Sequence, residues 1–361
     1  MKKKLLFICP YPINTVPGQR LKYEQYFNFF EENNFFCEVR SFFNIDEYKI
    51  LYSKGKLFQK IGAVLKGYLR RLYTLFELRN YDLTYIFLNV TPLGGSLFEK
   101  MFRFFSKKII YDIDDLVYLN KYYKENKLAK YFRYPSKYFY LMKSSDHIIT
   151  CTSYLDNFVK KYNKKTTNIS STVHTKIYTP KKFNRSNRIV VGWTGSFSTL
   201  PYLNLINNVI LKTQEMFGCD LHIISSKKEK FNYKKYKSIV WNSKNEVKDL
   251  KLIDIGLYPL PNEEWVKGKS GLKAIQFMSL GIPVIATDTE INRKVILNNK
   301  TGFLVNTEEE WLEALKKLII NKKKRERMSK NSIYHVKKNF SVDANKYKYL
   351  KIIKSLTKEK T

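Results

Sequence analysis

Short apolar runs alternate with longer stretches of helical periodicity along most of the chain. Parallel strands that are covered on both faces read as continuous apolar runs, and each parallel pair needs a crossover connection, usually a helix. The pattern therefore predicts an α/β fold of parallel sheets with crossover helices. The runs expected to form strands are residues 5–9, 83–88, 108–111, 147–151, 189–192, 221–224, 255–258 and 283–286.

The chain of 361 residues is long enough for two domains, because single hydrophobic cores usually stop growing before that length. We expect Rossmann-like domains over residues 1–180 and 188–338. Residues 161–188 are polar, carry Pro180 and directly precede a new strand-loop-helix unit, which is typical of a boundary. Residues 339–361 are predicted to form a C-terminal helix that packs back across the domains.

The sequence is strongly basic, with 66 Lys and Arg against 32 Asp and Glu and a formal net charge of +34. Such a surface favours polyanions, among them nucleic acid, anionic lipid headgroups and nucleotide phosphates. The excess is spread evenly, which a compositional bias of the source genome also explains. The four cysteines lie far apart and form no zinc or redox pair, which fits a reducing cytosol. No run is apolar enough to predict a membrane-spanning helix.

Two segments are both amphipathic and basic. In residues 56–78, apolar side chains recur at helical spacing beside lysines and arginines, and residues 121–143 are rich in basic and aromatic residues. Helices of this kind bind anionic membrane surfaces. The same period is also typical of a crossover helix whose apolar stripe faces the core and whose charged back faces water. Both interpretations stay open from the sequence.

Residues 254–286 contain the strongest indication of a binding site. A strand is followed by a loop rich in Lys and Gly, and a helix begins near Gly271. The first-turn N–H groups of a helix are unpaired, and its dipole favours negative charge. Lys267, Lys269 and Lys273 add positive charge around this point, so the segment is predicted to bind a diphosphate.

This segment resembles the retaining glycosyltransferases called family 4, whose C-terminal domain carries two glutamates eight residues apart before a Met-containing helix and a Gly-x-Pro-Val turn. The two glutamates fall on Gly268 and Gln276. The resemblance therefore implies a branch without either carboxylate, in which the amide of Gln276 can still bond a ribose hydroxyl. The residues that match are Gly271, Leu272, Met278, Gly281, Pro283 and Val284.

Other parts of the chain resemble the same family. Residues 190–199 have the form of the strand and loop that open the donor domain, where Gly195 permits close approach to a phosphate. Gly18 and Arg20 follow the first strand, where the family opens its cleft, although an arginine that simply opens a helix explains Arg20 as well. The resemblance implies a donor-binding set of Gly18, Arg20, Gly195, Ser196, Thr199, Lys267, Gly268, Lys269, Ser270, Gly271, Leu272, Lys273 and Gln276.

Asp112, Asp114 and Asp115 directly follow or end a predicted strand, where α/β sheets place their ligands. The resembled family has a polar residue near this point beside the reacting sugar. Asp114 or Asp115 is therefore expected to be catalytic, with Asp112 as the third member. The alternatives are a helix cap with surface carboxylates and an Mg²⁺ site, which paired aspartates can form. We expect no metal or cofactor, because the lysines can neutralise a diphosphate.

The resemblance implies a GT-B fold, in which two Rossmann-like domains face each other across a cleft, and a glycosyltransferase that retains the anomeric configuration. The expected donor is a UDP- or GDP-sugar. The expected acceptor is a lipid-linked or cell-surface glycan, such as lipopolysaccharide or capsule, reached from the cytoplasmic face of the membrane. Two alternatives remain, a non-catalytic sugar-nucleotide or polyanion-binding protein and a sugar-nucleotide epimerase. Nucleic acid is not expected as a partner, because no recognition-module signature is present.

Overall fold

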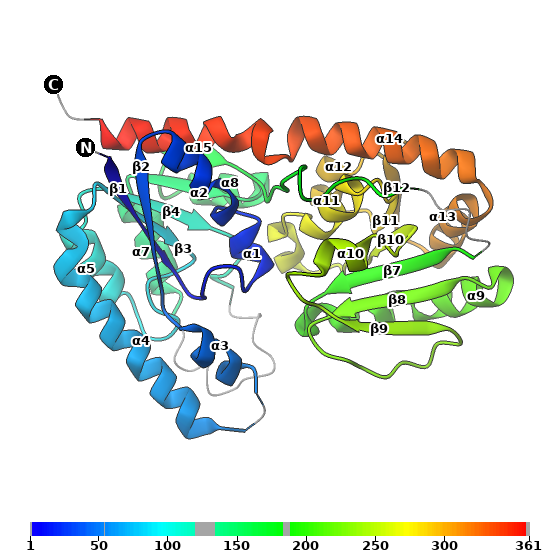
Figure 1. Cartoon of the computed structure of the whole chain (residues 1–361), viewed down its shortest axis with the longest axis horizontal. Helices are drawn as coiled ribbons and strands as arrows, with labels where there is room; N and C mark the ends of the chain where they lie inside the picture. The colour runs from blue at the N-terminus through cyan, green and yellow to red at the C-terminus, as the bar shows by residue number, and fades with distance from the viewer. Residues whose placement is uncertain (1, 54, 120–133, 183–187, 359–361) are drawn as a thin grey trace. The chain divides into compact units, whose positions relative to one another are not determined.

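In the computed structural model, which describes residues 2–53, 55–119, 134–182 and 188–358, the strands form two six-stranded sheets (Figure 1). All the pairings between these strands are parallel, so the predicted α/β fold of parallel sheets is confirmed. The chain divides into two compact units. Unit 1 comprises Met1–Ser171, Gly268–Ser270 and Asn345–Thr361, and unit 2 comprises Thr172–Lys267 and Gly271–Ala344.

The sheet of unit 1 has the order β2-β1-β3-β4-β5-β6, so the strand order reverses between β1 and β3. Its strands are β1 (Lys3–Cys9), β2 (Phe35–Ser41), β3 (Leu83–Phe87), β4 (Ile109–Ile113), β5 (His147–Thr150) and β6 (Thr166–Asn168). The helices of this unit are α1 (Pro17–Arg20), α2 (Phe27–Glu32), α3 (Ile45–Leu51), α4 (Leu57–Glu77), α5 (Leu97–Phe105), α7 (Ser136–Ser144), α8 (Ser153–Val159) and most of α15 (Val342–Thr357).

The two faces of this sheet have different cores. Leu6 and Ile8 share a mixed aliphatic and aromatic cluster with buried residues of α5, α7 and α8. Phe7, on the other side of β1, stacks on Tyr23 with ring centroids 5.5 Å apart. Tyr26 in turn lies 4.6 Å from Tyr349 of α15. Alternation along β1 thus places Leu6 and Ile8 in one core and Phe7 in another, on the opposite face of the sheet.

The sheet of unit 2 has the order β9-β8-β7-β10-β11-β12, which is the Rossmann order with its reversal between β7 and β10. Its strands are β7 (Val190–Gly195), β8 (Asp220–Ser225), β9 (Tyr236–Val240), β10 (Ile255–Tyr258), β11 (Val284–Thr287) and β12 (Gly302–Val305). The helices are α9 (Asn207–Phe217), α10 (Glu246–Leu250), α11 (Leu272–Ser279), α12 (Glu290–Val295), α13 (Glu308–Ile320) and α14 (Lys322–Asn339).

Local sequence explains where several of these helices begin and end. Helix α13 begins with a capping box, in which the Thr307 hydroxyl accepts from the Glu310 N–H and the Glu310 carboxylate accepts from the Thr307 N–H, both at 3.2 Å. Helix α9 ends at Gly218, whose φ of 62° is the left-handed conformation that closes helices. These signals fix the crossover helices between the strands.

The eight strands predicted from the sequence are all present, and they are the central strands of the two sheets. The four strands that the apolar runs missed are the sheet edges, namely β2, β6, β9 and β12. Edge strands are half exposed, so they lack the continuous apolar run of a buried parallel strand. Strand β9, for example, has no buried residue.

The structure tests the prediction of an amphipathic helix fully for one of the two basic segments and only in part for the other. Within residues 56–78, Leu57–Glu77 form the predicted helix, α4. Of residues 121–143, the part from 121 to 133 lies outside the described residues, and helix α7 begins at Ser136. No helix within the described ranges combines the length and the apolar composition needed to cross a bilayer.

Candidate functional site

The two sheets each have a point where the strand order reverses, and ligands of open α/β sheets bind outside the carboxyl ends of the strands at such a point. In unit 2 this point lies between β7 and β10, and in unit 1 between β1 and β3. Gly195, Ser196, Thr199 and Lys273 belong to the first of these places, and Gly18 and Arg20 follow β1 at the second. Each place is described below within its own unit.

In unit 2, Lys273 from the first turn of α11 lies at the carboxyl ends of β7 and β10. Its Nζ is 4.6 Å from the ring centroid of Trp193 on β7 and 5.9 Å from that of Tyr258 on β10. It donates a hydrogen bond to the Thr199 hydroxyl at 3.0 Å. We call Lys273, Trp193, Gly195, Thr199 and Tyr258 the Lys273 site. It brings together three of the predicted donor-binding residues, Lys273, Gly195 and Thr199.

Gly195 ends β7 inside this site. A Cβ at this position would lie 2.4 Å from the Trp193 ring and 2.5 Å from Lys273 Nζ, so only glycine fits without displacing them. Ser196 follows and is exposed, and its hydroxyl is 2.9 Å from that of Ser198 and 3.3 Å from that of Thr199. A cation and a group of hydroxyls thus meet where a ligand can approach the backbone closely.

Gln276 lies on the same helix as Lys273 but is buried in a polar network. Its Nε2 donates to the Tyr178 hydroxyl and to Glu246 Oε1, both at 3.1 Å. Glu246 also accepts from the Tyr178 hydroxyl at 2.5 Å and from the Trp241 indole at 2.9 Å. The structure therefore places the side-chain N–H groups of Gln276 on protein partners, and it places a carboxylate that the sequence did not single out beside the amide.

The loop before α11 is divided between the units. Lys267 is exposed in unit 2, whereas Gly268, Lys269 and Ser270 belong to unit 1. A Cβ on Gly268 would lie 2.7 Å from the backbone nitrogen of Leu116, so the position has no room for a side chain. The Gly268 carbonyl accepts from the Cys151 thiol at 3.3 Å.

Ser270 and Gly271 complete this loop. The Ser270 hydroxyl is hydrogen-bonded to that of Ser171 at 2.9 Å, and the Ser270 carbonyl accepts from the Ser170 hydroxyl at 3.3 Å. Gly271 has a φ of 70°, a left-handed conformation that favours glycine before the helix begins. Leu272 is half-buried at the start of α11. Ser270 is thus held by unit 1 hydroxyls, and Gly271 lets the chain turn into the helix.

In unit 1, Asp112 near the end of β4 is fully buried and paired. Its Oδ1 lies 3.3 Å from the Nζ of the equally buried Lys22, and the Tyr85 hydroxyl donates to its Oδ2. Lys22 also donates to the carbonyl of Ile169 at 2.8 Å. Burial raises the pKa of Asp112, and the charge of Lys22 opposes this effect. Asp112 is therefore a residue that holds its neighbours in place rather than one exposed to a substrate.

Asp114 and Asp115 follow β4 and differ from each other. Asp114 Oδ1 is buried and has no hydrogen-bond partner within the described ranges. Burial, with the neighbouring charge of Asp115, raises the pKa of Asp114 to about 6. Asp115 adopts a left-handed φ of 57° and accepts a hydrogen bond from Lys269 at 2.7 Å. We call Asp112, Asp114, Asp115, Lys22 and Lys269 the acidic cluster.

Gly18 and Arg20 lie on α1, close to the carboxyl end of β1. A Cβ on Gly18 would be 3.8 Å from Asp114 Oδ2, so this glycine lies beside the acidic cluster. Arg20 is half-buried, and its charge acts on the carboxylate of Glu24. Glu24 accepts hydrogen bonds from the Asn14 N–H at 2.9 Å and from the Gln19 amide at 3.1 Å.

Sequence reasoning missed several residues of both sites. Lys22 carries no signal in the sequence, because it stands among polar and charged residues, with Arg20 and Glu24 two positions away on either side. Tyr85 places a hydroxyl within an apolar strand, and such a group usually forms a hydrogen bond when buried. Trp193 enters its site through its ring, which lies against Lys273. Glu246 carries no signal in the sequence, because only the fold brings it to Gln276. Within the described residues no three His, Cys, Asp or Glu side chains gather into a possible metal-binding group.

Comparison with known proteins identifies a family for part of the chain. Residues 224–334, which include the Lys273 segment, match the family model described as "Glycosyl transferases group 1". No curated protein sequence matches the chain significantly. Many solved structures share its fold at low sequence identity.

Three of these structures cover nearly the whole chain. They are a sucrose-phosphate synthase from Thermosynechococcus elongatus (13% identity, 98% of this chain and 99% of that chain, TM-score 0.68), a glycosyltransferase from Rickettsia africae (12%, 100% and 100%, 0.66) and Anabaena HepE in complex with UDP and glucose (12%, 98% and 100%, 0.65). These similarities show that the fold is GT-B. The chain thus has the GT-B fold, and its residues 224–334 are similar to the glycosyl transferases group 1 family.

Proposed function

We propose that this protein is a glycosyltransferase that moves a sugar from a UDP- or GDP-sugar to a glycan or lipid-linked acceptor. The observation that carries the proposal is the Lys273 site, which lies at the strand-order reversal of unit 2. Two of its residues, Lys273 and Tyr258, belong to the segment that matches glycosyl transferases group 1. A solved structure of similar fold contains UDP and glucose. Retention of the anomeric configuration is expected from the resemblance to the family 4 enzymes.

On the donor side, Lys273 is proposed to stabilise the leaving diphosphate. Its ammonium lies beside the Thr199 hydroxyl and beside Gly195, where a side chain would displace it. Charge that develops on a leaving diphosphate is stabilised most by a cation fixed in advance, and two aromatic rings fix this one. The lysine supplies this charge itself, so the proposal includes no metal or cofactor.

On the acceptor side, Asp114 is proposed to bind a sugar hydroxyl. Its buried Oδ1 is available for a hydrogen bond, and the carboxylate is ionised at pH values above about 6. Asp115 is held by Lys269 and Asp112 by Lys22, so these two aspartates are proposed to position Asp114. A carboxylate of this kind orients a hydroxyl group during transfer.

The acceptor is proposed to be a cell-surface glycan or its lipid-linked precursor, such as lipopolysaccharide or capsule. Such an acceptor is presented at the inner face of the cell membrane, where the protein would bind peripherally from the cytoplasm. The formal net charge of +34 supports this placement, because anionic lipids attract basic proteins.

The first test is nucleotide binding, measured by thermal shift and by calorimetry with UDP, GDP and their sugars. One base is expected to raise the melting temperature, since a ligand that binds only the folded state stabilises it. Lys273→Ala should weaken that binding about tenfold or more, because it removes a charge-assisted contact to phosphate. Lys330→Ala, an exposed lysine of α14, is the matched control and should bind normally. No response to any nucleotide would contradict the donor site.

The second test is product analysis with the nucleotide sugar that binds. Release of the nucleoside diphosphate together with a glycosylated acceptor is the result expected of a transferase. A changed sugar that stays on the nucleotide would instead show an epimerase. Binding without any turnover, in the presence of lipid-linked acceptors, would show a non-catalytic binding protein.

A further inference from the structure

Helix α4 in unit 1 has its large apolar side chains on the outside. Phe58 and Phe76 are 88% and 87% exposed, and Leu65 and Leu69 are 60% and 64% exposed. The exposed positions recur three and four residues apart, so they share one side of the helix. We call them the apolar stripe, and its members are Leu57, Phe58, Ile61, Leu65, Leu69, Leu72, Tyr73 and Phe76.

Apart from Leu75, the buried residues of α4 are small or polar. Ala63, Gly67 and Thr74 are buried, and a Cβ on Gly67 would lie 2.3 Å from the Phe42 ring. Arg71 is fully buried and donates to the carbonyls of Cys9 at 2.8 Å, Arg40 at 3.0 Å and Val90 at 2.7 Å. The interpretation of this segment as a stripe that faces the core is therefore wrong for most of its apolar residues.

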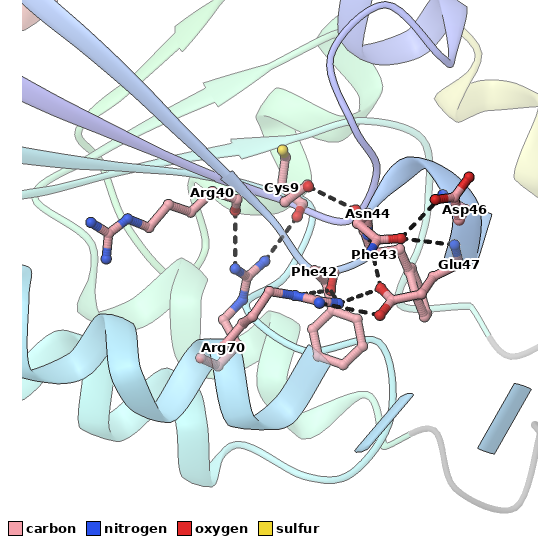
Figure 2. A network of polar contacts seen from close by, with 10 residues as sticks. Cys9, Arg40, Phe42, Phe43, Asn44, Asp46, Glu47 and Arg70 are labelled. Carbon is pink, nitrogen blue, oxygen red and sulfur yellow. Dashed lines mark hydrogen bonds and ion pairs between the residues drawn. The ribbon is translucent and has the colours of Figure 1, made fainter. Parts of the chain in front are cut away.

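Arg70 fixes the rotation of the helix as well. Figure 2 shows its side chain pointing from the helix to Phe42 and Glu47, where it donates to the Phe42 carbonyl at 2.6 Å and to Glu47 Oε1 at 3.2 Å. Glu47 is itself held by Asn44, whose N–H donates to its carboxylate at 2.9 Å. Because two arginines bind the inner side to the body of unit 1, the stripe cannot turn inward without breaking both sets of bonds.

The neighbouring helix adds to the exposed apolar surface. Helix α5 contacts α4 through Phe98, whose ring lies 5.2 Å from that of Tyr68, and the two helices lie next to each other in Figure 1. Leu97 and Phe104 of α5 are also exposed. Soluble proteins rarely expose a continuous set of large apolar side chains of this extent unless something binds it.

The charges around the stripe are almost all positive. Lys56, Lys66 and Arg79 are exposed beside it. The only acidic residue between positions 56 and 79 is Glu77, and it is paired with Arg40. A helix with an exposed apolar side and basic borders is typical of binding in the interfacial layer of an anionic bilayer.

We infer that the apolar stripe of α4, with Leu97 and Phe104 of α5, is a docking surface for an anionic lipid bilayer. The charge argument favours a membrane over a second copy of the chain, because two copies joined through this surface would bring the same basic borders together. The inference deepens the proposed function. It rests on that function in one respect, namely that a lipid-linked acceptor explains why the protein would bind a membrane. Vesicle binding itself requires no catalysis.

The test is co-sedimentation of the full chain with vesicles of phosphatidylcholine alone or mixed with phosphatidylglycerol. The protein should bind the mixed vesicles, and the variant Leu65→Gln/Leu69→Gln/Phe76→Gln should bind them about tenfold more weakly or worse, since apolar burial drives interfacial binding. A matched control replaces three exposed apolar residues of unit 2, Met216→Gln/Ile320→Gln/Tyr334→Gln, and should bind within about twofold of the original. Lys56→Gln/Lys66→Gln should weaken binding to the mixed vesicles and change binding to phosphatidylcholine little.

Three outcomes would overturn the inference. The first is that the original protein does not bind the mixed vesicles, and the second is that the stripe variant binds them as well as the original does. The third is that the original is a dimer in solution and the stripe variant a monomer, which would assign the stripe to a second copy. Nucleotide binding is measured on the same samples. Stripe variants that lose vesicle binding but keep nucleotide binding support the inference, and vesicle binding without any nucleotide binding would contradict the proposed function alone.

Discussion

The Lys273 site lies at the strand-order reversal of unit 2, and the aspartates of the acidic cluster lie at the carboxyl end of β4 in unit 1. The two sites use charge in opposite ways. Lys273 lies against two aromatic rings and a hydroxyl near the surface of unit 2. In the acidic cluster, Lys22 and Asp112 pair with no exposure to solvent. Breaking a buried pair leaves an uncompensated charge, whereas a cation near the surface can be removed at little cost. The comparison predicts that stability depends on the acidic cluster and nucleotide binding on the Lys273 site.

The largest expected effect comes from Lys22→Met. This change leaves Asp112 buried without its cation, which should lower the free energy of unfolding by about 3–5 kcal/mol. Lys273→Met, which makes the same replacement at the other site, should lower the free energy of unfolding by less than about 1 kcal/mol. Urea unfolding followed by circular dichroism measures both variants.

A second substitution tests whether the unpaired charge is the cause. Lys22→Met/Asp112→Asn should recover much of the loss, because the buried carboxylate is then neutral. Lys49→Met, which breaks an exposed pair with Asp46, should change stability by about 0–1 kcal/mol. Equal losses for Lys22→Met and Lys273→Met would remove the proposed difference between the two sites.

The next effect concerns Asp114, whose pKa is raised from its ordinary value of 3.8 to about 6. A raised pKa means that the folded state holds the proton more tightly, so this contribution to stability is full below pH 3.8 and is lost as the pH rises through about 6. Asp114→Asn should therefore be more stable than the original at pH 7, by up to about 3 kcal/mol, with no advantage at pH 4.

The same variant separates a catalytic from a structural role. If the ionised carboxylate binds a sugar hydroxyl, transfer by the original protein should rise with pH through about 6, and Asp114→Asn should lose most activity and that pH dependence. A helix-capping carboxylate predicts the reverse pattern. In that case the amide would retain activity and bring no gain in stability at pH 7.

The sequence predicted the central strands and much of the Lys273 site for a common physical reason. Buried parallel strands leave continuous apolar runs, and a loop rich in Lys and Gly before a helix is a local pattern that indicates Lys273. Gly195 is expected from the resemblance of residues 190–199 to the family's donor domain. The partners of Lys22 and Gln276 could not be found this way. Asp112 and Glu246 reach them only through strand order and helix packing, which no spacing along the chain records.

Helix α4 shows the other limit of sequence reasoning. Its period indicated an amphipathic helix correctly, but a period does not say whether the apolar side faces inward. Arg70 and Arg71 determine which side of the helix faces inward, although arginines are ordinarily expected on the solvent side. Both instead bind backbone carbonyls of unit 1 that lie far from them in the sequence.

The smallest effect tests the position at which this chain departs from the resembled family. Gln276→Glu restores the family's second glutamate but places a carboxylate against Glu246, whose Oε1 accepts from the present amide at 3.1 Å. Loss of this bond and repulsion between like charges should lower the free energy of unfolding by about 1–3 kcal/mol at pH 7, and less at acid pH, where one carboxylate takes up a proton. Thermal unfolding at both pH values measures the difference. The exchange Gln276→Glu/Glu246→Gln should recover stability, because an amide and a carboxylate again face each other. If the single variant is as stable as the original and binds the nucleotide more tightly, Gln276 belongs to the donor site rather than to the network with Glu246 and Tyr178.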